Sequence, residues 1–425
     1  MNQISCRVPL IDGVDKVTGA LRFTADLHVE GMLHGAMVFS PRPHAHVRNV
    51  AANAALAATG VHAVFWHANT PAHRYNSSIW FAGQEALADE QMFPPVVRHI
   101  GDRVAAVVAD TEEIARNAAR LIVVEYEDLP AILAPEVALL HAGSVTQADG
   151  IPTFLNPVAE EEFIHGDLEA GFAAADLVVE ACVSTPRSHH CAIETHACIA
   201  KPESDGRILI LSPCQSVFAV QAVVAQALGL PAERLRVMKT PIGGSFGGKA
   251  EPILEPLCAF FATKLGRPVM IRYDRHETFT ATRTRSSVTG RMRVGLSVDG
   301  RILARETETL VDIGAYCTGG NYLPGSMLQR LVRLYDVPAE RYRGRAVYTN
   351  TIPAGAFRGY GSPQIHTVAE LTLVIAARRQ VMHPVELRLK NIVGPGAIEP
   401  RQGLDLGNAR GRECLVQGAE AFGWK

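Results

Sequence analysis

The sequence predicts an α+β protein with two or three domains, and three observations carry this prediction. The chain has 425 residues, more than a single hydrophobic core usually serves. Stretches with strand-like apolar character alternate with stretches that have the period of an amphipathic helix. Residues 290–316 alternate on both sides of an Asp299-Gly300 turn, which predicts an antiparallel hairpin.

Composition narrows the class of protein. Hydrophobic residues make up 48% of the chain and charged residues 20%, which is typical of a globular protein and argues against extended disorder. A formal net charge of −2 gives no field that would attract nucleic acid. No signal-peptide pattern is present, and no apolar run approaches the roughly 20 residues that span a bilayer. We therefore expect a cytoplasmic protein with neither a membrane nor a nucleic acid as partner.

The eight cysteines are scattered along the chain and form no C-x-x-C pair. This spacing predicts neither a zinc ribbon nor an iron–sulfur cluster in this chain. In a chain of this size we expect reduced, mostly buried thiols.

A first module is predicted for residues 10–130. Its expected elements are a helix over 46–60, strands over 61–66 and 102–110, a helix over 111–121 and a strand over 121–127. Gly60 is expected to end the first of these helices. Asp110 stands where the N-cap of the second would be, with Glu113 three residues on, a capping-box arrangement.

Between Asp128 and Glu160 the periodicity is lost and four prolines occur, so residues 131–160 are expected to be an extended connector. A second module is predicted for residues 161–395, with residues 396–425 as a tail. Its expected strands cover 177–187, 206–212, 235–240 and 268–274, and its expected helices cover 218–230, with Gly229 near the C-cap, and 254–266.

The stretch PIGGSFGGKAEP follows one of these strands directly. Residues 243–249 fit the phosphate-loop pattern G-x-x-x-x-G-K, but the next position must be Ser or Thr to hold Mg²⁺, and it is Ala250. The Rossmann fingerprint fails as well, because Ser245 replaces its second glycine. The four glycines flanking Ser245 and Phe246 allow a close backbone approach to a ligand and expose N–H groups as a nest. A tight turn without a ligand is the alternative.

GGSFGGK, together with AFRGYGSPQ further on, resembles the molybdenum-cofactor subunit of the xanthine dehydrogenase and aldehyde oxidase family. Five other stretches resemble successive landmarks of that family in the same order, and they cover nearly the whole chain: GVDKVTGALRFTADL, SPRPHAHV, GDRVAAVVAD, IVVEYEDLP and HHCAIETHACIA. The resemblance implies an N-terminal α/β hammerhead domain followed by the first molybdopterin-binding α+β domain.

The resemblance also implies which residues meet the cofactor, molybdopterin in its cytosine dinucleotide form. No side chain of this chain is expected to bind molybdenum directly. Gln215 is expected to donate a hydrogen bond to the molybdenum oxo group, and Gly244, Phe246 and Gly247 to lie on the loop that meets the cofactor. Arg358 lies on a second such loop. The alternatives are a solvent-facing glutamine, a core phenylalanine and a surface arginine.

Three further positions are implied to face the substrate. Tyr360 matches the aromatic residue that packs on the substrate ring, with core packing as the alternative. Arg285 is expected to act in catalysis by stabilising negative charge that develops on the substrate. The alternative is a phosphate contact or an exposed arginine next to Arg283. Ala250 stands where purine-oxidising members carry a glutamate, and Glu251, one residue along, is expected to point elsewhere.

The implied activity is hydroxylation of an N-heterocycle such as xanthine or hypoxanthine, with water as the oxygen source. Electrons would leave through a [2Fe–2S] subunit and an FAD subunit. The family's catalytic glutamate has no counterpart here, so a second half or partner subunit is expected to supply it, or the chain is a truncated gene product. Nicotinate dehydrogenase, aldehyde oxidoreductase and a non-catalytic remnant are the alternatives.

Overall fold

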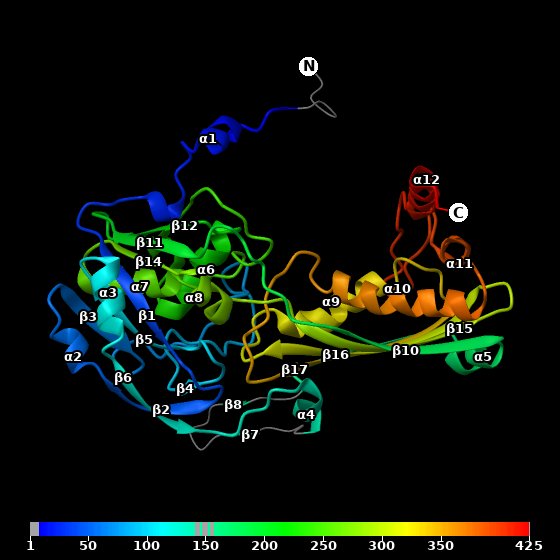
Figure 1. Ribbon diagram of the computed structural model, residues 1–425, viewed down its shortest axis with the longest axis horizontal. Helices are drawn as coiled ribbons and strands as arrows, with labels where there is room; N and C mark the ends of the chain where they lie inside the picture. The colour runs from blue at the N-terminus through cyan, green and yellow to red at the C-terminus, as the bar shows by residue number, and fades with distance from the viewer. Residues whose placement is uncertain (1–7, 141–144, 147–151, 154–156, 425) are drawn as a thin grey trace. The chain divides into compact units, whose positions relative to one another are not determined.

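The computed structural model describes residues 8–140, 145–146, 152–153 and 157–424, and the chain forms two compact units (Figure 1). One unit comprises Met1–Pro130 and His190–Arg283, and the other comprises Ala131–His189 and Thr284–Lys425. Each unit is therefore built from two stretches that are separated in the sequence. The domain limits expected from the sequence, at residues 10–130, 161–395 and 396–425, stay a prediction.

A mixed seven-stranded sheet organises the first unit, in the order β13-β12-β11-β14-β1-β5-β3. Its strands are β1 (Leu33–Phe39), β3 (Val61–Trp66), β5 (Arg103–Ala109), β11 (Ala197–Pro202), β12 (Ile208–Ser212), β13 (Leu235–Lys239) and β14 (Val269–Arg272). Strands β1 and β14 pair in parallel and so join the two stretches of this unit. A second sheet has the order β4-β2-β6, with β4 (Val96–Val97), β2 (Ala45–Ala51) and β6 (Val123–Asp128).

Helices complete the first unit. They are α1 (Gly13–Thr18), α2 (Asn53–Leu56), α3 (Glu112–Ala119), α6 (Val217–Leu228), α7 (Glu255–Leu265) and α8 (Arg275–Ala281), with the 3₁₀ turns η1 (Thr24–Asp26) and η2 (Ala232–Arg234). Helix α7 is buried over most of its length, because it packs on β11 and contacts α6 as well. Its Phe261 stacks on Phe65 with ring centroids 4.7 Å apart, in the largest apolar cluster of the unit.

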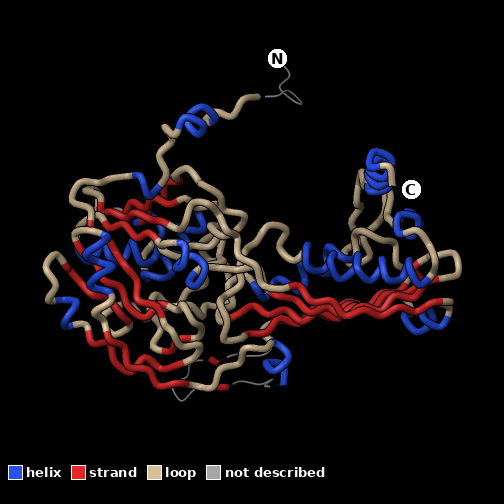
Figure 2. Tube along the Cα trace, viewed as in Figure 1, coloured by secondary structure: helices blue, strands red, loops and turns tan. Residues whose placement is uncertain are grey.

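The second unit has a five-stranded sheet in the order β10-β15-β16-β17-β9. The strands are β9 (Ala159–His165), β10 (Leu177–Thr185), β15 (Ser287–Leu296), β16 (Ile302–Gly314) and β17 (Ala339–Tyr348), and the short pair β7 (Val145–Thr146) and β8 (Pro152–Thr153) lies apart from them. The helices are α4 (Pro135–Leu140), α5 (Leu168–Ala173), α9 (Leu323–Leu331), α10 (Ser362–Arg379), α11 (Pro384–Asn391) and α12 (Gly411–Phe422), with the 3₁₀ turn η3 (Gly320–Tyr322). Helix α10 runs along the strands and packs on β10 and β15 (Figure 2).

The same sheet carries a row of alternating charges. Neighbours in the register are Glu180 on β10, Arg293 on β15, Glu306 on β16 and Arg341 on β17. The Glu306 carboxylate lies 3.0 Å from the Arg293 guanidinium and 3.5 Å from that of Arg341. Opposite charges in adjacent strands stabilise this register, and the exposed face of the sheet is polar.

Several elements confirm the sequence prediction. Strands β3, β5, β6, β10, β12, β13 and β14 lie where they were expected, as do helices α3, α6 and α7. Gly229 and Gly266 end their helices with the left-handed backbone that glycine adopts readily. The antiparallel pairing of β15 with β16 confirms the hairpin, and Gly300 in its turn has a φ of +85°.

The helix expected over residues 46–60 is largely wrong. Residues 45–51 form β2, and only Asn53–Leu56 is helical. The apolar side chains of Ala45, Val47 and Val50 are buried where β2 pairs with β6, and a register shift between Val47 and Asn49 interrupts the alternation that would have marked a strand. Gly60 does turn the chain, with a φ of +84°.

Two local predictions need correction. The N-cap of α3 is Thr111, whose hydroxyl accepts the Ile114 N–H at 3.2 Å, and not Asp110. The Asp110 carboxylate instead contacts His62 at 2.7 Å, so the expected capping box with Glu113 does not form. Within the expected extended connector, Pro135–Leu140 is helical.

Four of the seven cysteines in the described ranges are buried, namely Cys198, Cys214, Cys258 and Cys317. This confirms the expectation of mostly buried cysteines for that part of the chain, whereas Cys6 lies outside it. In the same ranges, no helix has the length and apolar character needed to cross a membrane.

Candidate functional site

The glycine loop connects β13 to α7 in the first unit. Gly244, Phe246 and Gly247 have φ values of +102°, +55° and +108°. The backbone N–H groups of Gly244, Ser245 and Phe246 have no hydrogen-bond partner among the residues that the structure describes. Successive unpaired donors on a left-handed backbone form a concavity that suits an anionic or oxygen-rich group.

Gln215, just before α6, lies against this loop, and its hydrogen bond to a molybdenum oxo group stays a prediction. Its side-chain oxygen accepts the Ser245 hydroxyl and, at 3.1 Å, the Gly247 N–H. Because a backbone N–H can only donate, the amide oxygen must face the loop and the NH₂ group must face away. That NH₂ group has no partner in the described ranges, so it remains available as a donor to a ligand.

Phe246 is 49% exposed, which rules out the core phenylalanine that was the alternative. A positive φ is unusual for a side chain this bulky and indicates that other residues hold the loop in place. Glycine is favoured at position 244, because its φ of +102° is one that other residues rarely adopt and a Cβ there would lie 3.2 Å from Ala192 Cβ. That the ring lies beside a metal stays a prediction.

Lys249 does not behave as a phosphate-loop lysine. Its side chain is 3% exposed, and its Nζ lies 2.6 Å from Glu194 Oε2. Burial lowers the pKa of Lys249, and the Glu194 carboxylate opposes that shift. An ammonium group that is buried and paired in this way is not available to phosphate oxygens.

We therefore expect no saturable binding of Mg-ATP in the micromolar range (roughly 1–100 μM). The Lys249 ammonium is engaged by Glu194, and Ala250 has no hydroxyl to hold Mg²⁺. Isothermal titration calorimetry on the folded protein measures this. Micromolar affinity for ATP that is lost in Lys249→Ala would contradict the expectation.

The second predicted loop precedes α10 in the second unit. Gly359, Tyr360 and Gly361 have φ values of +92°, +32° and +87°. Arg358 is exposed, and within the described ranges its guanidinium makes no hydrogen bond or ion pair. A loop of this shape with an unpaired cation, at the N-terminus of an 18-residue helix, suits an anionic group. Contact with the cofactor stays a prediction.

Arg285 is held in place within the second unit by neutral groups. Its Nη2 donates to the Arg358 carbonyl at 2.9 Å and its Nη1 to Gln364 Oε1 at 3.4 Å. Its guanidinium carbon lies 3.9 Å from the centroid of the Phe357 ring. Burial lowers its pKa, and no carboxylate pairs with it in the described part of the chain. The half-buried guanidinium is therefore held in one position, and no carboxylate among the described residues neutralises its charge.

Tyr360 is half-buried and packs against the apolar cluster between α9, α10 and the sheet. Its hydroxyl donates to the Gly319 carbonyl, and its own carbonyl accepts the Ser326 hydroxyl at 3.0 Å. These contacts fit the core-packing alternative, and a contact with the substrate ring stays a prediction.

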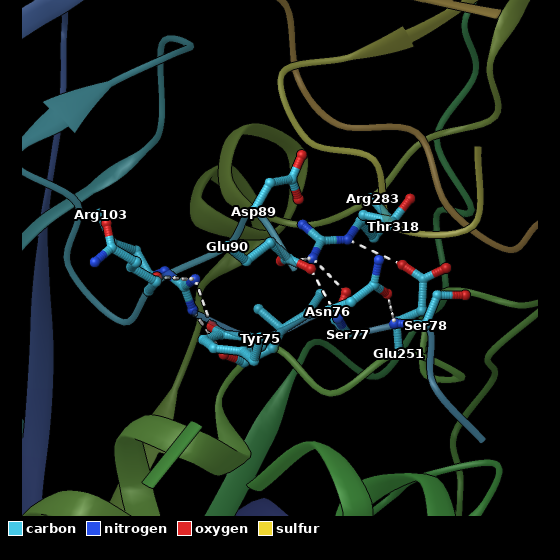
Figure 3. A network of polar contacts seen from close by, with 12 residues as sticks. Tyr75, Asn76, Ser77, Ser78, Asp89, Glu90, Arg103, Glu251, Arg283 and Thr318 are labelled. Atoms are coloured by element: carbon cyan, nitrogen blue, oxygen red, sulfur yellow. Dashed lines mark hydrogen bonds and ion pairs between the residues drawn. The ribbon is translucent and has the colours of Figure 1, made fainter. Parts of the chain in front are cut away.

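Ala250 and Glu251 end the glycine loop. Ala250 is buried, and its N–H donates to the Gly247 carbonyl at 3.0 Å. Glu251 is buried, and its Oε2 accepts a hydrogen bond from Arg283 Nε at 3.0 Å. Arg283 also pairs with Glu90 and donates to Ser77 Oγ at 2.9 Å, in a buried polar network (Figure 3). Arg283 is thus buried and paired with two carboxylates.

Each unit brings together part of the predicted site. The first unit gathers Gly244, Phe246, Gly247 and Ala250 on one loop with Gln215 against it, and the second gathers Arg285, Arg358 and Tyr360.

Sequence reasoning did not identify Glu194, Phe357 or Gln364. A signal for Glu194 existed in the buried lysine of a loop that lacks a Mg²⁺ ligand, because such a lysine needs an acidic partner. No comparable signal marks the other two.

Two protein families match the chain. Residues 18–130 match the a/b hammerhead domain of aldehyde oxidase and xanthine dehydrogenase, and residues 154–392 match the molybdopterin cofactor-binding domain. The xanthine dehydrogenase molybdenum-binding subunit of Escherichia coli O157:H7 is 34% identical over 98% of this chain and 55% of its own length. The nicotinate dehydrogenase large molybdopterin subunit of Eubacterium barkeri is 31% identical over 91% of this chain and 88% of its own length.

A solved structure agrees with these matches. The aldehyde oxidoreductase of Desulfovibrio gigas superposes with a TM-score of 0.88 and 32% identity, over 98% of this chain and 46% of that one. The chain thus spans about half the length of the Escherichia coli and Desulfovibrio proteins.

Proposed function

This chain belongs to the xanthine dehydrogenase and aldehyde oxidase family of molybdenum oxidoreductases, and on that premise we propose that it forms the molybdopterin-binding part of a hydroxylase for N-heterocycles such as xanthine or hypoxanthine. The proposed substrate class rests on the environment of Arg285, whose half-buried guanidinium is held in place and has no carboxylate partner among the described residues. A substrate that develops negative charge on ring nitrogens or carbonyl oxygens matches such a group.

The glycine loop supports the cofactor part of the proposal. The unpaired N–H groups of Gly244, Ser245 and Phe246 and the outward NH₂ of Gln215 are donors, and a pyranopterin with its phosphates and oxo group offers acceptors. We assign the cytosine dinucleotide form. When bound, the cofactor supplies the acceptor for the two electrons of the oxidation, with water as the source of oxygen.

The residues of this chain position and polarise the reactants. Arg285 binds the electron-rich edge of the heterocycle, and its attraction strengthens as negative charge develops there. Tyr360, which lies in the same unit as Arg285, supplies apolar surface that excludes water and strengthens this interaction. On the glycine loop of the first unit, the exposed Phe246 ring offers apolar surface to the cofactor. The carboxylate base comes from protein outside these 425 residues, and [2Fe–2S] and FAD subunits accept the electrons in turn.

Nicotinate is the second candidate substrate. Ala250 lacks the carboxylate that purine-oxidising members use, and the chain covers 88% of the nicotinate dehydrogenase subunit named above. The carboxylate of nicotinate would also pair with the Arg285 guanidinium.

A substrate comparison tests the proposal. The protein, purified with its partners from a host that makes the cofactor, is assayed with hypoxanthine, nicotinate and benzaldehyde and an artificial electron acceptor. We expect kcat/KM for one heterocycle to exceed that for the aldehyde by at least about 100-fold, the scale on which a site built for polar groups discriminates. Label from H₂¹⁸O should appear in the product. Equal or better turnover of the aldehyde would contradict the proposal.

A further inference from the structure

Glu194 contacts both ends of the glycine loop. It lies three residues before β11, and its side chain is 11% exposed. Its Oε2 accepts the Gly243 N–H at 2.7 Å and lies 2.6 Å from Lys249 Nζ. Its own backbone N–H donates to the Gly243 carbonyl at 3.0 Å. Residues 243 and 249, the first and last of the loop pattern, thus converge on one carboxylate.

Gly243 packs closely on the Glu194 side chain, and one oxygen of the Glu194 carboxylate is buried. A Cβ at Gly243 would lie 2.6 Å from Glu194 Cβ, so only glycine fits there. The second carboxylate oxygen, Oε1, is buried and has no hydrogen-bond partner in the described ranges. The Gly243 N–H and the Lys249 ammonium therefore stabilise the largely buried Glu194 carboxylate, which in turn stabilises the buried ammonium.

Residues 244–248, between these two contacts with Glu194, adopt an unfavourable backbone conformation that other residues must hold in place. Phe246 has a positive φ, which a bulky side chain adopts only when its surroundings impose it. Gln215 holds the middle of the loop through Ser245 and Gly247. Without the anchors at residues 243 and 249, the three unpaired N–H groups would not be kept together.

We propose that Glu194 is a positioning residue, whose ion pair with Lys249 closes the glycine loop into the shape that captures the oxygen-rich part of the cofactor. The proposal rests on the proposed function, since it takes that cofactor as the ligand. It gives the buried lysine a role in this loop other than binding phosphate.

Two variants separate positioning from plain stability. Glu194→Gln keeps an oxygen for the Gly243 N–H but leaves the Lys249 ammonium buried without its carboxylate. The double variant Glu194→Gln/Lys249→Met removes both charges, so its thermal midpoint should return toward that of the parent protein. The matched control is Glu203→Gln, which removes an ion pair with Arg236 at the opposite end of β11.

Molybdenum is counted per folded chain after size-exclusion chromatography, and hydrogen exchange is measured on the cofactor-free protein over residues 240–251. We expect both variants to hold roughly 10-fold less molybdenum, the scale for a lost outer-shell partner. Loop amides should exchange about 10-fold faster in both. The control should match the parent protein in each measurement.

The outcomes are distinct. If molybdenum content recovers in the double variant together with the thermal midpoint, Glu194 is only structural and the proposal is wrong. Equal loading of parent and Glu194→Gln protein overturns it as well. If the parent binds no molybdenum but the variants still show faster loop exchange, the proposed function fails while the hold of Glu194 on the loop is supported.

Discussion

Replacing Arg285 by methionine in the loaded enzyme is expected to lower kcat/KM for the best N-heterocyclic substrate by roughly 10²–10³. Methionine retains the stem that packs near Phe357 but removes the charge. The Arg358 carbonyl and Gln364 already hold the guanidinium in place, so it need not move as the transition state forms. Its removal should therefore lower the rate of the chemical step. Steady-state kinetics with the substrate series above measure the effect.

Gln364 allows a sharper test of the same charge. It is buried and accepts Arg285 Nη1 through a neutral amide oxygen. Gln364→Glu changes almost no volume but places a carboxylate beside the guanidinium, so kcat/KM should fall although Arg285 is intact. Arg291→Met, at an exposed arginine paired with Glu180, is the control and should leave kinetics unchanged. Unaltered kinetics in Arg285→Met would show that Arg285 has no role in catalysis.

The second large effect is on stability. Arg283→Met should lower the free energy of unfolding by about 3–5 kcal/mol, because it leaves the buried carboxylates of Glu90 and Glu251 without their cation. For a unit of this size the thermal midpoint should fall by roughly 6–20 °C. Urea unfolding followed by circular dichroism measures the loss.

A compensating variant checks the cause of that loss. Replacing Glu90 and Glu251 by glutamine together with Arg283→Met removes all three charges, and it should regain at least about half of the lost stability. A loss below about 1 kcal/mol in Arg283→Met would mean that the network is open to water. No recovery in the triple variant would assign the loss to packing and not to charge.

The sequence predicted those elements whose signals are local. Helices α6 and α7 were predicted with their glycine C-caps, and the β15–β16 hairpin with its Asp-Gly turn, because a few adjacent residues specify each of them. Strand β2 was missed because a register shift breaks its alternation. Its identity as a strand depends on pairing with β6, which begins more than 70 residues later.

In the candidate site, too, the sequence predicted features with local signals and missed those that depend on long-range contacts. Glycine spacing predicted a loop with exposed N–H groups, and the resemblance placed Gln215 and Arg285. The loop lysine calls for an acidic partner, but which carboxylate provides it could not be predicted, because the contact between Glu194 and Gly243 joins residues 49 positions apart. The important property of Arg285 is the lack of an acidic partner in the described part of its unit, and only a three-dimensional arrangement reveals such a lack.

The pairing of β1 with β14 has a consequence for biosynthesis. Leu33 pairs with Val269, which the ribosome adds 236 residues later (269 − 33). At about 5–20 residues per second, β1 waits roughly 10–50 s for this neighbour. During that time β1 can pair with β5 but keeps its other edge open, and an open edge is a template for association with other nascent chains. Production of this protein should therefore depend on chaperones that cover such edges during translation.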